Sequence, residues 1–253
     1  MKPFIVICAV GLSSLTSCRE KAKAKEEPAA PVMNEVTELP GKERAANAAQ
    51  SVRPKLERDL AAMGLKFGDP VFIRAFKEEK QLEFYVRNRV TKKFDLFRAY
   101  EIAGASGMLG PKLAEGDLQV PEGFYFVPPD AMKPDSQFHL AFNIGYPNEF
   151  DLAHQRTGSF IMIHGSCRSI GCLAMTDPII DEIYTLCDAA HNGGQPFFRV
   201  NFFPFRMTTE RMQAAAGNPN EEFWKNLKEG DDLFEKSHIP PEVSVADGRY
   251  QFR

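Results

Sequence analysis

The sequence predicts a mainly β domain with α-helices, an α+β fold in which a sandwich or barrel-like sheet is flanked by helices. Short runs rich in aromatic and β-branched residues follow one another, each bounded by Gly, Pro, Asn or Asp, as is typical of strands. Helical patterns precede this series once and then cluster near its end. With 253 residues and 43% hydrophobic content, the chain can bury a substantial core.

The predicted strands are short and rich in Phe, Tyr, Val or Ile. No internal repeat relates them to one another. They lie at 71–76, 82–86, 94–102, 123–127, 138–144, 160–164 and 197–203. Successive short strands joined by turns favour a sandwich or barrel-like sheet.

Three helices are predicted around these strands. The first covers 52–65, where apolar residues recur at helical spacing. The second follows Asp177 as N-cap and Pro178 in its first turn, and stops at Gly193-Gly194. The third includes 220–229.

The N-terminus has the pattern of an export signal. Lys2 precedes an apolar run from Phe4 to Leu15, which is too short for a membrane helix, so we expect a signal peptide over 1–17. The small residues before Cys18 resemble the lipobox of bacterial lipoproteins. This resemblance implies that Cys18 carries lipid and anchors an exported lipoprotein on the periplasmic side of a bacterial membrane. The alternative is a plain signal peptide with a coincidental cysteine.

The segment that follows has a different composition from the rest. Residues 19–50 are rich in Lys, Glu, Ala and Pro and contain no aromatic residue, so they cannot bury enough apolar surface to fold alone. We therefore expect a lipid-anchored tether over 18–50 and a catalytic domain over 51–253.

Net charge argues against a nucleic-acid partner. The chain carries a formal charge of −3, and no basic stretch falls within the predicted domain. A nucleic-acid-binding protein would need a positive footprint on its surface.

The segment "HGSCRSIGC" at 164–172 concentrates reactive residues. A zinc site could use His164, Cys167 and Cys172, but paired ligand spacings such as C-x2-C are lacking. A disulfide among Cys167, Cys172 and Cys187 is open, because an exported chain meets an oxidising compartment. Cys187 is more simply a buried thiol on the apolar side of its helix.

A third reading makes the segment a nucleophile with its base. His164 ends a predicted strand and Cys172 precedes a predicted helix, so we expect sulfur and ring nitrogen within about 4 Å, directly or through one water. A histidine at that distance can hold the thiol as thiolate, the nucleophilic form. Gly171 lets the backbone bend close to the reacting carbon, where amides can line an oxyanion hole.

The same residues resemble the YkuD-type L,D-transpeptidase catalytic domain, in a divergent subgroup reading "HGxCxSxGCxAMTD". The resemblance extends over roughly residues 65 to 250, including "GDLQVPEG", "FNIGYPNEFD", "RTG" and "FPFRMT". It implies an L,D-transpeptidase-like fold, Cys172 as nucleophile and His164 as general acid and base. Ser169 and Gly171 would then shape the site and supply backbone contacts.

Two positions depart from the larger family's motif. Ile170 stands where the motif has a second histidine, and Ala174 stands where it has arginine. For substrate binding, Arg156 could grip a stem-peptide carboxylate bidentately, with an internal salt bridge as the alternative, and Tyr146 could line the groove.

The resemblance implies two-step acyl transfer at the carbonyl of a diaminopimelate residue in peptidoglycan stem peptides. No metal or organic cofactor is needed. The alternatives are an amidase that hydrolytically releases a wall-linked lipoprotein from peptidoglycan, and a non-catalytic wall-binding lipoprotein.

Overall fold

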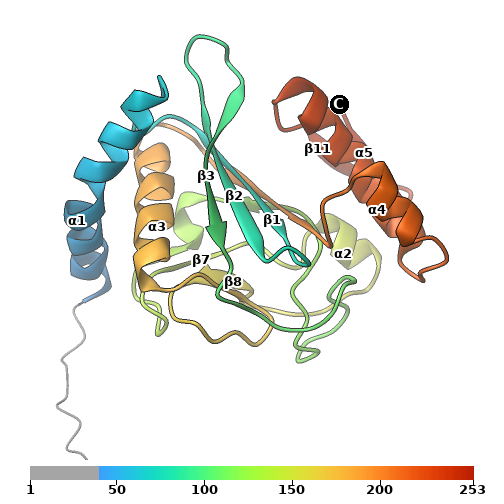
Figure 1. Ribbon diagram of the computed structural model, residues 1–253. Helices are drawn as coiled ribbons and strands as arrows, with labels where there is room; N and C mark the ends of the chain where they lie inside the picture. Colours follow the sequence, from blue (N-terminus) through green and yellow to red (C-terminus); the bar gives the residue numbers. More distant parts are fainter. Residues whose placement is uncertain (1–39) are drawn as a thin grey trace, which may run out of the picture. The chain divides into compact units, whose positions relative to one another are not determined.

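The computed structural model describes residues 40–253 and confirms the predicted α+β class. In this part of the chain, strands form two five-stranded sheets and a separate hairpin, and helices cover them (Figure 1). The predicted signal peptide, Cys18 and most of the predicted tether lie outside the described residues.

The first sheet has the order β3-β2-β1-β10-β5. Its strands are β1 (Val71–Phe76), β2 (Gln81–Arg87), β3 (Phe94–Glu101), β5 (Gly123–Val127) and β10 (Phe198–Phe203). The β1–β10 pair is parallel and the other pairs are antiparallel. Every residue of β1 is buried, because both faces of the sheet are covered, and this explains its mostly apolar composition. The one charged residue, Arg74, pairs with Glu83 and Asp231.

The second sheet, which carries the candidate site, has the order β4-β9-β8-β7-β6. Its strands are very short: β4 (Gly104–Ala105), β6 (Met132–Lys133), β7 (Ala141–Asn143), β8 (Met162–His164) and β9 (Leu173–Ala174). A 3-10 turn at Pro129–Ala131 leads into β6.

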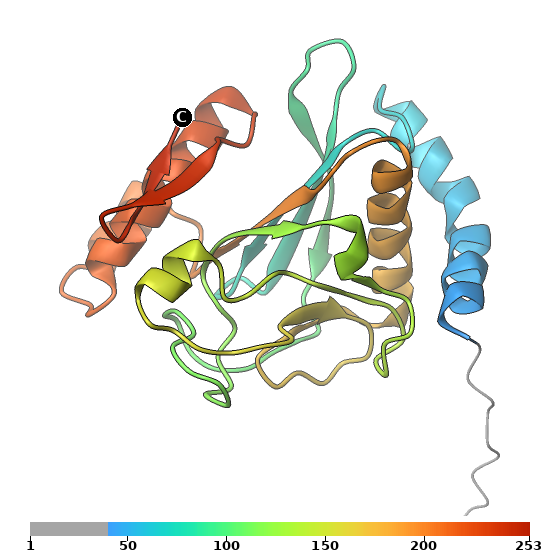
Figure 2. The same cartoon turned by 180° about the vertical axis from the view of Figure 1, so that it is seen from behind.

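The helices lie in two groups on opposite sides of the first sheet (Figure 2). One group is α1 (Gly41–Ala62) beside α3 (Asp177–Asn192). The other includes α4 (Thr209–Ala214), α5 (Glu221–Ser237) and the hairpin of β11 (Val243–Ala246) with β12 (Arg249–Phe252). A short helix, α2 (Glu149–Ala153), has Asn148 as its N-cap, and Asn148 forms a capping box with Asp151.

The main core lies between the two sheets and α3. Phe142 of the second sheet meets Phe198 of the first edge-on, with ring centroids 5.3 Å apart. The opposite face of the first sheet packs against α5, where Phe72, Tyr85 and Phe234 form an aromatic cluster. The second sheet is therefore held by core residues on its inner face.

The structure differs from the predictions at two helix starts. α1 begins at Gly41, ahead of the predicted helix at 52 and the predicted domain start at 51, because its alanine-rich first half docks on the domain and buries Ala48. For α3, the N-cap position is Thr176 and Asp177 is the first helical residue. The Asp177 carboxylate instead accepts a hydrogen bond from the Ser166 amide, 2.7 Å away.

Between residues 40 and 253, no helix combines the length and the apolar character needed to cross a membrane.

Candidate active site

The two reactive residues of 164–172 flank a loop between neighbouring parallel strands. In the β8–β9 pair, Ile163 lies opposite Leu173 and His164 lies opposite Ala174. Side chains alternate along a strand, and Ile163 and Leu173 fill the core. The alternation therefore directs His164 to the opposite face of this sheet, while Cys172 is the residue directly before β9.

The His164 ring is buried and its tautomer is fixed by a backbone carbonyl. The side chain is 2% exposed, and Nδ1 lies 2.5 Å from the Gly165 oxygen. A carbonyl only accepts, so Nδ1 carries the proton and Nε2 presents the lone pair. Burial lowers the pKa of His164, and the bond to Gly165 opposes this only in part. The ring is thus a neutral base at neutral pH.

The Cys172 thiol is partly buried and contacts the backbone ahead of β8 and at its start. The Met162 amide donates to Sγ at 3.4 Å, and Sγ lies 3.6 Å from the Phe160 oxygen. Burial raises the pKa of Cys172, while the Met162 amide and the charge of Lys112 lower it by less. The resting thiolate expected from the sequence is thus disfavoured, because the half-buried sulfur loses more hydration than its neighbours replace.

No hydrogen bond joins the Cys172 thiol to the His164 ring within residues 40–253. The distance predicted from the sequence, direct or through one water, therefore stays a prediction.

The lowered pKa of His164 and the raised pKa of Cys172 predict how modification of the Cys172 thiol depends on pH. We expect alkylation of Cys172 by iodoacetamide to rise with pH, with a midpoint above that of a short cysteine peptide, because burial raises the pKa of this thiol. Rates at a series of pH values, followed by peptide mass mapping, measure it. A midpoint below that of the reference peptide would indicate a thiolate–imidazolium pair and contradict the neutral resting state.

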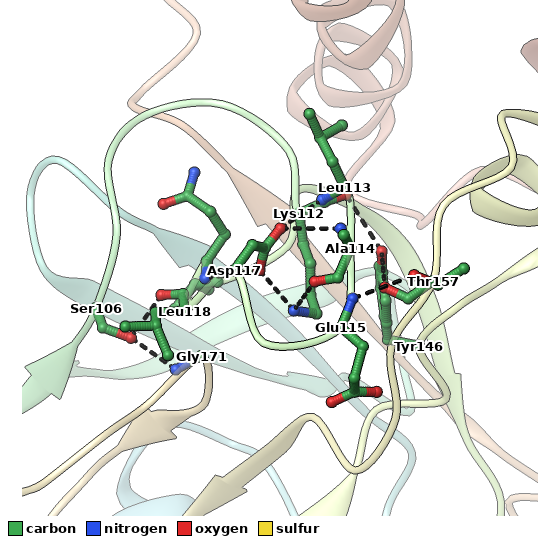
Figure 3. A network of polar contacts seen from close by, with 12 residues as sticks. Ser106, Lys112, Leu113, Ala114, Glu115, Asp117, Leu118, Tyr146, Thr157 and Gly171 are labelled. Carbon is green, nitrogen blue, oxygen red and sulfur yellow. Dashed lines mark hydrogen bonds and ion pairs between the residues drawn. The ribbon is translucent and has the colours of Figure 1, made fainter.

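A second loop, residues 106–119, is tied to the loop that carries Cys172 (Figure 3). The Ser106 hydroxyl accepts a hydrogen bond from the Gly171 amide at 2.6 Å and donates to the Leu118 carbonyl at 2.8 Å. Gly171 has φ +91°, a left-handed conformation that favours glycine. Ser106 therefore fixes the residue before Cys172, and this contact was not predicted from the sequence.

An internal ion pair stabilises this second loop. Lys112, 3% exposed, donates to the Asp117 carboxylate at 2.6 Å and to the Ala114 carbonyl at 2.8 Å. Burial would raise the pKa of Asp117, but Lys112 and three backbone amides together hold it at about 2. The carboxylate is thus charged throughout the neutral range, and the loop keeps its shape.

Removing the Ser106 hydroxyl tests this link. We expect Ser106→Ala to lower kcat by roughly 2- to 10-fold, the effect of losing one net hydrogen bond next to the nucleophile. Ser106→Thr, which keeps the hydroxyl, is the matched control and should retain most activity. Equal kcat values for the alanine variant and the wild type would show that this link does not act on the site.

The remaining predicted site residues have structural partners. The Ser169 hydroxyl donates to the carbonyl of Cys172, within the same loop. Tyr146 is 5% exposed, and its hydroxyl donates to the Lys112 carbonyl at 3.2 Å. Arg156 is 8% exposed and ion-paired with Asp151 at 2.8 Å, the salt bridge weighed as its alternative role. Their roles toward substrate stay predictions.

The cysteines of residues 40–253 are all free. Cys167 is exposed, Cys172 is half-buried and Cys187 is fully buried in α3. The structure thus shows none of the disulfides that the sequence left open. Within the same residues, no group of three His, Cys, Asp or Glu side chains is placed to hold a metal ion.

The sequence of this chain is similar to a known family and to two curated proteins. The sequence model of the YkuD family, the L,D-transpeptidase catalytic domain, matches residues 70–232, more than half of the chain. YafK of Escherichia coli strain K12, whose name marks it as a candidate L,D-transpeptidase, is 46% identical over 183 residues, which are 72% of this chain and 74% of YafK. YafK of Escherichia coli O157:H7 matches equally.

Solved structures resemble the chain less closely. The helical cell shape determining protein Pgp2 of Campylobacter jejuni has a TM-score of 0.45 at 19% identity, covering 76% of this chain and 80% of Pgp2. Bd1075 of Bdellovibrio bacteriovorus has a TM-score of 0.39 at 18% identity, covering 74% of this chain and 85% of Bd1075.

The match to the family model covers both sheets and the loop from His164 to Cys172. The chain belongs to the YkuD family of L,D-transpeptidase catalytic domains.

Proposed function

We propose that the chain is a cysteine acyl-transfer enzyme that acts on the carbonyl of a diaminopimelate residue in peptidoglycan stem peptides. The observation that carries the proposal is that His164 ends β8 and Cys172 directly precedes the paired parallel strand β9, so that both flank one loop. The bond from Nδ1 to Gly165 in addition leaves the lone pair of His164 on Nε2. Family membership supports peptidoglycan as the substrate class.

In the first step, His164 Nε2 takes the proton of the Cys172 thiol as sulfur bonds to the substrate carbonyl carbon. The tetrahedral intermediate then collapses. The protonated His164 gives its proton to the leaving amine, the C–N bond breaks, and a thioester remains on Cys172. Because the thiol is neutral at rest, proton removal and sulfur attack are coupled.

Backbone amides beside the nucleophile stabilise the oxyanion. The Gly171 amide already donates to Ser106, so the amide of Cys172 itself is the better placed donor. The role of Gly171 is then conformational. Its φ of +91° gives a turn directly before Cys172, and the Cys172 amide is the donor assigned to the carbonyl oxygen.

The second step decides between two activities. An amine acceptor gives transpeptidation, and water gives hydrolysis, each restoring the thiol through His164. Two departures from the larger family's motif speak against ordinary cross-linking, and so support hydrolysis, including release of a wall-linked lipoprotein from peptidoglycan. Ile170, 75% exposed, and Ala174, fully buried, occupy the places of the histidine and arginine in the larger family's motif.

Incubating the protein with muropeptides, with and without an acceptor amine, tests the function. Product masses distinguish a shortened stem with a free carboxylate from a new amide. We expect one of these two products. Binding with no product in either condition would leave only the non-catalytic wall-binding role.

The same proposal places the protein at a membrane through its N-terminus. We expect Cys18 to carry lipid after removal of 1–17, and residues 18–40 to link that anchor to α1. The intact mass of the protein extracted from membranes shows whether residues 1–17 are removed and whether Cys18 carries lipid. A mature chain that begins at Met1, or lacks an acyl mass at Cys18, would rule out the anchor.

A further inference from the structure

The loop of residues 134–139 forms one wall beside the His164 ring. The Phe138 ring lies against the imidazole, with centroids 4.8 Å apart and planes inclined by 34°. The Phe138 carbonyl is 2.8 Å from the position that a Cβ at Gly165 would take. The Gly165 amide donates to the Leu140 carbonyl at 3.0 Å. This loop therefore contacts both the His164 ring and Gly165, whose carbonyl accepts from His164 Nδ1.

α1 holds the outer side of the same loop. Arg44 Nη1 donates to the Ser136 carbonyl and to the His139 carbonyl, each at 2.7 Å. Gly41 packs so closely that a Cβ there would lie 2.5 Å from the Asp135 amide nitrogen. One guanidinium thus fixes the main chain on both sides of Phe138.

The N-terminal half of α1 has few apolar anchors. The leucines that α1 buries, Leu56 and Leu60, belong to its second half, and Ala48 is the one buried residue of the first half. Alanine removes little apolar surface from water. A groove remains beside this half, lined on the helix side by Lys42, Ala45, Ala46 and Ala49. The hydrogen bonds of Arg44 are therefore a main attachment of this half to the domain.

We propose that Arg44 is a positioning residue for the active site, which fixes the loop of residues 134–139 and so holds the Phe138 ring against His164. The proposal rests on the proposed function in that His164 is taken as the general base. The family match begins at residue 70, so this support comes from a helix outside the matched segment.

Two further polar contacts in this region do not use the Arg44 side chain. His139 pairs with Asp181 at 2.6 Å, and Asp177 accepts from the Ser166 amide. These contacts involve α3 and the loop after His164. A change in His164 after substitution of Arg44 therefore reports on the loop of residues 134–139, which contains both Phe138 and His139.

The test uses the full chain with Arg44→Met, which keeps side-chain length but removes the donors. We expect kcat to fall roughly tenfold with KM within about twofold, because misorientation of the base affects the chemical step. The NMR signal of the His164 Cε1 proton, assigned through its loss in His164→Ala, should shift as the Phe138 ring moves. Its titration midpoint should rise, because the ring becomes better hydrated.

Two further variants serve as references. Arg44→Lys keeps a cationic donor and should recover part of kcat. Lys55→Met removes an exposed ion pair with Asp59 on the same helix and should leave kcat and the His164 signal unchanged.

A double-mutant cycle with Phe138→Ala separates positioning from general stability. If Arg44 acts through Phe138, Arg44→Met adds little to the loss of kcat in the Phe138→Ala background. Independent, multiplicative losses would overturn the proposal, as would an Arg44→Met variant with wild-type kcat and an unchanged His164 titration. Failure of the proposed function looks different, because turnover would then persist in His164→Ala while Arg44→Met still moved the His164 signal.

Discussion

Replacing Cys172 with alanine is expected to lower turnover of muropeptides by at least about 10³-fold, because the nucleophile and its covalent intermediate are lost. Alanine fits the half-buried site without a clash, so the fold should persist. Turnover rates of purified variants, with thermal melts beside them, measure the effect.

Cys167→Ala is the matched control for this result. Cys167 is exposed in the same loop, and its replacement should leave turnover within about twofold of the wild type. An active Cys172→Ala variant together with an inactive Cys167→Ala variant would reassign the nucleophile.

Replacing His164 with alanine is expected to lower turnover by roughly 10²- to 10⁴-fold at neutral pH, the usual contribution of a general acid and base. The loss should be large because burial raises the pKa of the Cys172 thiol, so little thiolate exists without the base. Rates at several pH values are the measurement, and the loss should shrink as pH rises and the thiol ionises unaided.

His154→Gln controls for the loss of a histidine. His154 is exposed and stacks on Phe150, with ring centroids 4.1 Å apart. Its replacement should leave turnover near that of the wild type. A His164→Ala variant with full activity at neutral pH would remove His164 from the mechanism.

The first sheet could be predicted closely because its strands carry their own signal. β1 coincides with the predicted run 71–76, and β2 extends the run 82–86 by one residue at each end. These strands are largely buried on both faces, so their composition is mostly apolar, and the buried Arg74 and Glu83 pair with each other at 2.8 Å. The second sheet has strands of two or three residues, which tertiary contacts define more than composition does, and the predicted strands 138–144 and 160–164 are longer than β7 and β8.

The candidate site was predictable only where its residues are neighbours in sequence. His164 and Cys172 lie eight positions apart in one motif, whereas Ser106 reaches Gly171 across 65 residues and Arg44 reaches His139 across 95. A single serine or arginine in a polar stretch carries no signal of such a contact. The raised pKa of the thiol was missed for a related reason, because burial of one sulfur depends on the whole fold.

A trapped adduct would show that an acyl group passes through Cys172. The protein is mixed with muropeptide, quenched in acid during turnover, and digested with trypsin. Cleavage after Arg168 separates Cys167 from Cys172, and fragment ions separate Cys172 from the buried Cys187 in the same peptide. We expect a thioester-linked stem fragment on Cys172 that is absent from Cys172→Ala. An adduct on Cys167, or product formation by Cys172→Ala, would contradict it.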